Sequence, residues 1–98
     1  MTVEKKETGD ITELKLKGWL DTQNAPVLEE TMAALDGGTR ELVFDCAELE
    51  YISSSGLRQF VGAYKRMNGA LTLRNVPSGI MSVIAMTGLY KMLKIENG

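Results

Sequence analysis

Leu42-Val43-Phe44 is an unbroken apolar run in the middle of the chain, between two segments whose apolar residues recur at helical spacing. Such a run favours a β-strand that is covered on both faces, because a strand with one wet face alternates apolar and polar residues. The flanking apolar residues are Leu28, Met32 and Leu35 before the run and Leu57, Phe60, Val61 and Tyr64 after it. Helices on both sides of a buried strand are typical of right-handed crossovers in a parallel sheet. The sequence therefore predicts an α/β fold.

Turn signals extend this pattern along the whole chain. Residues 11–17 alternate at Leu14 and Leu16, and a turn at 8–10 joins them to a short strand at 2–6. The two strands are expected to pair as an antiparallel hairpin at one edge of the sheet. Asn24 is expected to cap the first helix, which has Pro26 in its first turn and Gly37-Gly38 as its stop. The further strands are expected at 41–45, 70–73 and 92–95. Two more helices are expected to end at Asn68-Gly69 and at Gly88. The predicted order is ββαβαβα with a short last strand, in a single domain over residues 1–98, with a mostly parallel sheet flanked by helices.

Missing residue types exclude several kinds of site. The 98 residues contain no His, which removes Ser-His-Asp and Cys-His catalysis and the commonest metal ligand. The one cysteine, Cys46, cannot form an internal disulfide or a zinc cluster, and this suits a reducing compartment. We therefore expect a cytoplasmic protein that uses neither of these catalytic arrangements and that holds no metal or cofactor.

Charge and hydropathy indicate neither a membrane nor nucleic acid. Residues 1–10 are polar, unlike a signal peptide, and the apolar runs are far shorter than the ~18 residues of a membrane span. The net charge of -2 gives no general attraction to nucleic acid or anionic lipid. Residues 21–50 nevertheless carry eight acidic residues, Asp36 among them, against Arg40 alone, whereas residues 51–98 are mainly basic. The acidic stretch is either a solvated face or a docking surface for a basic partner.

The expected third helix has no charged residue between Ser78 and Thr87. A helix on the surface of a globular protein normally has a polar face. Two interpretations remain open. The helix is either mostly buried against the sheet, or it exposes a patch containing Met81 and Met86 that meets a partner.

The most unusual local feature is Ile52-Ser53-Ser54-Ser55-Gly56-Leu57, which lies between the apolar strand and the next helix. Loops that leave the carboxyl ends of parallel strands are where α/β proteins build their sites. The bland interpretation is helix capping, which needs one of the three hydroxyls. A nucleophile elbow would lack its first glycine and a His, and a phosphate-binding loop would lack its Lys. A phosphorylation acceptor is the remaining functional interpretation, since a helix N-terminus favours an anion.

The segment Tyr51 to Arg58 resembles the signature of the STAS domain of bacterial anti-sigma factor antagonists. Other landmarks that resemble this family are Gly18-Trp19-Leu20-Asp21 after the second strand, the buried strand at 42–45, Val76-Pro77-Ser78 and Thr87-Gly88-Leu89. The resemblance covers nearly the whole chain.

The resemblance implies a function in partner switching rather than catalysis. In that family an anti-sigma factor serine kinase phosphorylates a serine of this loop, the unphosphorylated antagonist binds the kinase and frees the sigma factor, and a phosphatase resets the switch. The acceptor position, two residues before the glycine, is Ser54 here, with Ser53 and Ser55 as alternatives. Many members have Asp where this chain has Ser53. The partner surface implied by the family is the loop 45–56 with the next helical turn, and its residues are Asp21, Ser53, Ser54, Ser55, Gly56 and Arg58.

Two other functions remain open. One is an unphosphorylated STAS subunit of a transporter or of a signalling ATPase. The other is a stand-alone binder of a small molecule or nucleotide, for which the sequence offers no loop motif.

Overall fold

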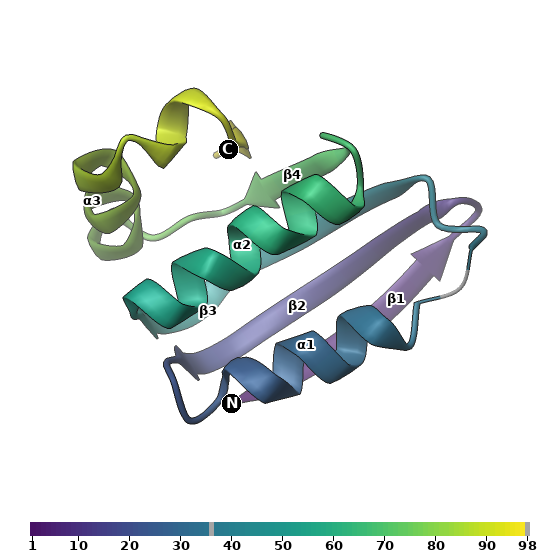
Figure 1. Cartoon of the computed structure of the whole chain (residues 1–98), viewed down its shortest axis with the longest axis horizontal. Helices are drawn as coiled ribbons and strands as arrows, with labels where there is room; N and C mark the ends of the chain where they lie inside the picture. Colours follow the sequence, from purple (N-terminus) through teal and green to yellow (C-terminus); the bar gives the residue numbers. More distant parts are fainter. Residues whose placement is uncertain (36, 98) are drawn as a thin grey trace.

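The computed structural model describes residues 1–35 and 37–97, and within these residues five strands form a single sheet (Figure 1). The strand order is β1-β2-β3-β4-β5, with β1 antiparallel to β2 and every other pair parallel. The elements are β1 (Thr2–Thr8), β2 (Ile11–Leu20), α1 (Ala25–Ala33), β3 (Glu41–Ile52), α2 (Ser54–Arg66), β4 (Leu71–Arg74), α3 (Ser78–Thr87), the 3₁₀ turn η1 (Leu89–Lys91) and β5 (Lys94–Glu96). The predicted α/β class and the antiparallel edge strand are confirmed.

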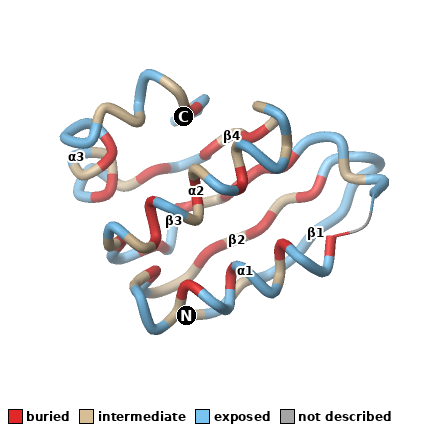
Figure 2. The backbone as a smooth tube through the Cα atoms, in the orientation of Figure 1, coloured by how far each residue is buried: buried red, intermediate tan, exposed pale blue. Residues whose placement is uncertain are grey.

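The core lies between the sheet and helices α1 and α2, which cover the same face of the sheet (Figure 1). Leu14, Phe44 and Leu73 lie in register on neighbouring strands and are fully buried. Buried residues recur at alternate positions in the first half of β2, so one face of this strand meets the helices and the other does not (Figure 2). Phe44 contacts Phe60 of α2 with ring centroids 5.3 Å apart. The apolar stripes predicted from the sequence thus meet in one core, except for Val61, which is half-buried and lies outside it.

The opposite face of the sheet is charged, yet the expectation that 42–44 is covered on both faces is confirmed, because all three residues are buried. Residues Glu13, Val43 and Thr72 form one row on this face, with Lys15, Asp45 and Arg74 in the next. Val43 is nevertheless buried. The Arg74 guanidinium lies 3.3 Å from the Glu13 carboxylate, and because these residues belong to β4 and β2 their ion pair crosses β3 beside Val43. The aliphatic parts of long charged side chains can cover an apolar residue without a second layer of helices.

Helix α3 is only partly buried. Strand β4 pairs only with residues 42–45 of β3, so the rest of β3 extends beyond the end of β4. Helix α3 lies past this end of β4 and packs against β3 (Figure 1). Ile80 and Ile84 are buried, whereas Met86 is 87% exposed. The interpretation of a mostly buried helix is therefore wrong for one side of α3, because an uncharged face remains in solvent.

Strand β3 is longer than predicted. It continues from Glu41 to Ile52 instead of ending at residue 45, and it pairs with β2 through two register shifts. Such irregularities break the alternation of buried and exposed residues that identifies a strand in a sequence. Residues 46–52, which lie beyond the predicted strand, are therefore also strand, and only Ser53 separates β3 from α2.

Three smaller predictions also differ from the structure. Helix α1 ends at Ala33, before the Gly37-Gly38 stop, and the last strand is Lys94–Glu96 rather than 92–95. The side chain of Asn24 makes no capping hydrogen bond to α1. Asp36 of the acidic stretch lies outside the described residues.

Candidate functional site

The serine turn, residues 53–56, lies where the carboxyl ends of β2 and β3 meet. Leu20 and Ile52 are register partners at these ends, and the Ser53 amide donates a hydrogen bond to the Leu20 carbonyl at 3.0 Å. The turn therefore begins directly from paired backbone. The β2–α1 loop, which begins at Asp21, leaves the same edge of the sheet.

The three serine hydroxyls have different environments. The Ser53 hydroxyl caps α2 by accepting a hydrogen bond from the Gly56 amide at 3.3 Å, and its backbone is extended as an N-cap requires. The Ser55 hydroxyl pairs with the Thr22 hydroxyl of the β2–α1 loop at 2.9 Å. The Ser54 side chain is exposed and hydrogen-bonds to no other residue that the structure describes. Ser54 is thus the serine with a free hydroxyl.

Gly56 allows α2 to approach the end of β2. A Cβ atom at this position would lie 2.5 Å from the Leu20 carbonyl oxygen and 2.7 Å from Cγ1 of Ile52. Both distances are shorter than side-chain contacts in folded proteins, so only glycine fits without movement of the helix. The close approach holds the first turn of α2, and with it Ser54, at a fixed place beside the β2–α1 loop.

Asp21 has a structural role in the β2–α1 loop. Its carboxylate accepts hydrogen bonds from the Asn24 amide at 2.9 Å and from the Asn24 side chain at 3.0 Å. The Asp21 carbonyl also accepts from the Ala25 amide at 2.8 Å. Asp21 therefore holds the loop ahead of α1 in place, through hydrogen bonds to Asn24 and to the first amide of the helix.

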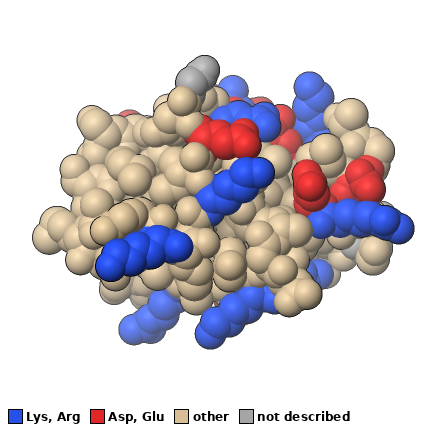
Figure 3. All heavy atoms as spheres, turned by 90° about the horizontal axis from the view of Figure 1, so that it is seen from above, with Lys and Arg blue, Asp and Glu red and all other residues tan. Residues whose placement is uncertain are grey.

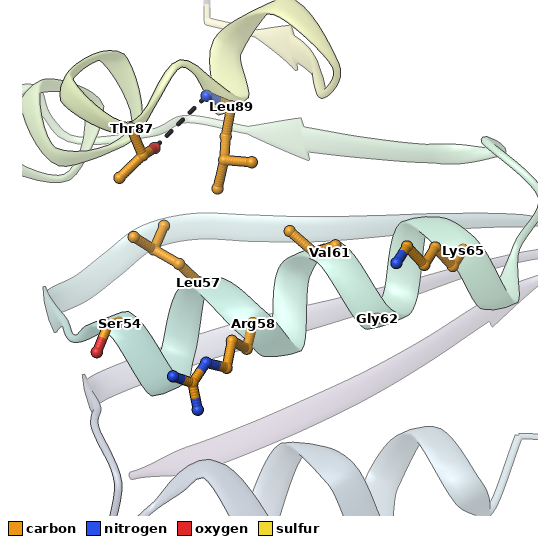
Figure 4. A pocket seen from close by; sticks show the side chains of 8 residues that line it. All are labelled: Ser54, Leu57, Arg58, Val61, Gly62, Lys65, Thr87 and Leu89. Atoms are coloured by element: carbon orange, nitrogen blue, oxygen red, sulfur yellow. Dashed lines mark hydrogen bonds between the residues drawn. The ribbon is translucent and has the colours of Figure 1, made fainter.

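The electrostatic setting of Ser54 is favourable for an anion. The first turn of α2 contains no acidic residue, and Arg58 follows Ser54 by four positions, which places it on the same side of the helix. Arg58 is exposed, and its side chain extends from α2 near Ser54 (Figure 4). The helix N-terminus and Arg58 together would stabilise a phosphate on this hydroxyl.

The acidic stretch 21–50 does not form one surface. Glu48 lies on the charged sheet face, 2.9 Å from Lys15 and 3.8 Å from Lys17, whereas Glu29 and Glu30 are exposed on α1. The hydrogen bond from Lys15 is the main reason that the pKa of Glu48 is lowered, and the same bond raises the pKa of Lys15. Part of this negative charge is therefore already compensated within the chain.

The buried thiol of Cys46 is not a reactive group. Its side chain is fully buried in the core, and burial raises its pKa to about 12. A thiol that stays protonated is a poor nucleophile and a poor metal ligand.

Among residues 1–35 and 37–97, no three His, Cys, Asp or Glu side chains are grouped so that they could hold a metal ion. In the same residues, no helix combines the length and the apolar character needed to cross a bilayer.

An exposed aromatic pair near the serine turn was not predicted from the sequence. Trp19 is 54% exposed and Tyr51 is 44% exposed, and their ring centroids lie 5.0 Å apart. They are register partners on β2 and β3, close to the ends that lead to Asp21 and Ser53. A longer β3 in the prediction would have revealed this pair, since Trp19 and Tyr51 then fall on adjacent strands.

A groove also opens beside Ser54, between α2 and the junction of α3 with η1 (Figure 4). We call it the α2–α3 groove; its volume is about 490 Å³. It is lined by Ser54, Leu57, Arg58, Val61, Gly62, Lys65, Thr87 and Leu89. Only Ser54 and Arg58 of this group are site residues predicted from the sequence, because the groove exists only where Thr87 and Leu89, some thirty residues later in the chain, close it from the other side.

The family model described as STAS domain matches residues 2–98. The chain belongs to the STAS domain family. Two relatives are named anti-sigma-B factor antagonist. The protein of Bacillus subtilis is 28% identical over 99 residues, which cover 98% of this chain and 91% of the relative. The protein of Staphylococcus aureus is 31% identical over 90 residues, which cover 88% of this chain and 83% of the relative. The resemblance seen in the sequence is thereby confirmed.

Solved structures of other proteins have the same fold as this STAS chain. A Thermotoga maritima protein described as a candidate anti-sigma factor antagonist aligns with a TM-score of 0.87 at 19% identity, over 98% of this chain and 86% of its own. The unphosphorylated anti-sigma factor antagonist SpoIIAA aligns with a TM-score of 0.75 at 14% identity, over 99% and 89% of the two chains. A sulfate transporter family protein from Wolinella succinogenes aligns with a TM-score of 0.76 at 12% identity, over 88% and 75%. At these identities the structural matches establish the fold alone.

Proposed function

We propose that this STAS protein is an anti-sigma factor antagonist that acts as a reversible phospho-switch in the cytoplasm. In its unmodified form it binds an anti-sigma factor serine kinase, which then releases its sigma factor. Phosphorylation of Ser54 ends this binding, and a phosphatase restores it. The protein carries out no reaction of its own. The relatives named anti-sigma-B factor antagonist support this class of function.

The observation that carries the proposal is the free hydroxyl of Ser54. Phosphorylation of Ser53 would remove the cap of α2, and phosphorylation of Ser55 would break its hydrogen bond to Thr22. Ser54 gains a phosphate without losing a hydrogen bond to the described residues. The phosphate adds a charge of about -1.5 to -2 at pH 7, beside a helix N-terminus that tolerates it. We therefore expect the fold to stay unchanged while the docking surface changes.

Ser53 occupies the position where many members of the family have Asp, and its side chain is engaged as the cap of α2. Asp also caps helices well, so the exchange preserves the turn. It removes a second negative charge beside the phosphate. We therefore expect phosphorylation to change the serine turn from neutral to negative in this chain, which is a sharper contrast than in members whose Asp is already charged.

The test is phosphorylation by a serine kinase of the anti-sigma factor type, followed by intact-mass measurement. We expect one added phosphate on the unaltered chain and none on Ser54→Ala, while Ser53→Ala and Ser55→Ala are still modified. Phosphate on Ser54→Ala would move the acceptor to a neighbouring serine and refute the assignment. Ser54→Asp should mimic only part of the effect, because a carboxylate has less charge and fewer acceptor oxygens than a phosphate.

The consequence for binding is measured by titrating both forms against the ADP-bound kinase. A loss of about 3 kcal/mol corresponds to a more than hundredfold weaker complex, which is enough to release a partner. Equal affinities of the two forms would refute the switch. They would leave the other candidate, an unphosphorylated STAS subunit of a transporter or signalling ATPase.

A further inference from the structure

The α2–α3 groove presents a continuous stripe of one helix. Its six α2 residues follow one another at intervals of three, one, three, one and three positions, so they share one face of the helix. From Ser54 to Lys65 the stripe is about 16 Å long at 1.5 Å per residue. Leu57 and Val61 of α2 point into the space from one side and Leu89 points into it from the other (Figure 4). The groove therefore has the length of about three helical turns and an apolar floor.

The charges around the groove have one sign. The charged residues that line it are Arg58 and Lys65, and α3, on the other side, contains no charged residue at all. In Figure 3, the end of the molecule that carries α3 is at the left, and it is a broad uncharged area with Lys and Arg side chains in the lower part of the view. A groove with an apolar floor and a basic rim is complementary to an acidic amphipathic partner.

Gly62 lies in the middle of this stripe, and no contact with the described residues requires a glycine there. A Cβ atom at this position would meet nothing within 4 Å, and the residue has ordinary helical backbone. Glycine inside a helix is less stable than alanine by roughly 0.5–1 kcal/mol. Such a position is used where another backbone approaches closely. Gly62 leaves the backbone of α2 open at the centre of the groove.

From this combination we infer that the α2–α3 groove binds an acidic amphipathic helix of a partner protein. Apolar side chains of that helix lie against Leu57, Val61 and Leu89, its backbone approaches Gly62, and its carboxylates pair with Arg58 and Lys65. Ser54 forms one end of the groove. The inference rests on the proposed function in one respect: a phosphate on Ser54 adds negative charge beside an acidic occupant and so repels it.

The test uses the full unmodified chain and a blocked synthetic peptide of about 15 residues, with Leu at helical spacing and Glu at most other positions. A matched peptide carries Lys in place of Glu. We expect the Glu peptide to bind and to shift the backbone amide resonances of Gly62 and Leu89, and the Lys peptide to bind about tenfold more weakly or less. Equal binding of the two peptides, or shifts confined to another surface, would overturn the inference.

Two variants of the chain sharpen the test, each with a matched control. Gly62→Ala should weaken peptide binding about tenfold through overpacking, while raising the melting temperature by about 4 °C. Gly79→Ala, in a helix and equally open to solvent, should leave binding unchanged. Arg58→Gln and Lys65→Gln should each weaken binding about two- to fivefold, and Arg40→Gln, which does not line this groove, should not. Undiminished binding to Gly62→Ala would refute the docking mode.

The remaining outcomes separate this inference from the proposed function. Self-association of the free chain that Gly62→Ala abolishes would assign the groove to a second copy and overturn the inference. Peptide binding is measured without a kinase, so it stands even where Ser54 accepts no phosphate, and in that case only the switch fails. Phosphorylation of Ser54 without any binding of the Glu peptide would leave the switch intact and refute the groove.

Discussion

Gly56→Ala should destabilise the protein although alanine is the better helix former. The added Cβ atom would lie 2.5 Å from the Leu20 carbonyl oxygen, 2.7 Å from Cγ1 of Ile52 and 2.9 Å from Cγ of Leu20. The first of these atoms belongs to the backbone and accepts the hydrogen bond of the Ser53 amide, so it cannot rotate away. The start of α2 must instead move outward from β2.

The size of the effect follows from two opposing contributions. Overpacking in a close contact costs about 1–3 kcal/mol, and the upper end applies here because backbone is involved. The gain in helix propensity returns at most about 1 kcal/mol. We expect a net loss of about 2 kcal/mol in the free energy of unfolding, which corresponds to a melting temperature lower by roughly 8–16 °C for a domain of this size.

Urea unfolding followed by circular dichroism measures this loss, with Gly62→Ala as the control in the same helix. The control gains propensity without a contact, so it should be more stable than the unaltered chain. The displaced turn should also impair phosphorylation of Ser54 in samples that are still folded. A Gly56→Ala protein as stable as Gly62→Ala would refute the packing described for the serine turn.

Four further outcomes are expected. Ser53→Ala should lower the free energy of unfolding by about 1 kcal/mol in urea titrations, because α2 loses its cap. Ser53→Asp should keep most of this stability, since Asp also caps helices. Equal losses in the two variants would contradict the capping role. Asp21→Ala should cost a similar amount by the same measurement because Asn24 loses two hydrogen bonds, and an unchanged midpoint would show that this loop does not depend on them. Cys46, with its pKa raised to about 12, should resist thiol reagents at pH 8 until the chain unfolds, and fast labelling of the folded protein would show that it is accessible. Stability should also fall as the pH rises above about 9, because the thiol of the unfolded chain ionises there while the buried thiol keeps its proton.

Local patterns in the sequence were enough for the fold class and for the place of the site. The apolar stripes of α1 and α2 and the alternation in β2 are properties of short segments, so they predict the elements before any packing is known. The serine motif is equally local, because its position between a strand and a helix follows from its neighbours. The same holds for the absence of His, which excludes whole classes of chemistry whatever the fold.

Contacts between distant segments decided the rest. Which serine is free depends on Thr22, a residue of another loop that engages Ser55 across 33 positions of the chain. The length of β3 and the exposure of Trp19 beside Tyr51 depend on pairing with β2 through irregular register, which no single segment encodes. Val43 needs no second layer of helices because an ion pair from two other strands crosses beside it. Residue types and their spacing determine which hydrogen-bonding and apolar groups are available, whereas only the tertiary structure determines which of them are already engaged and which remain open to a partner.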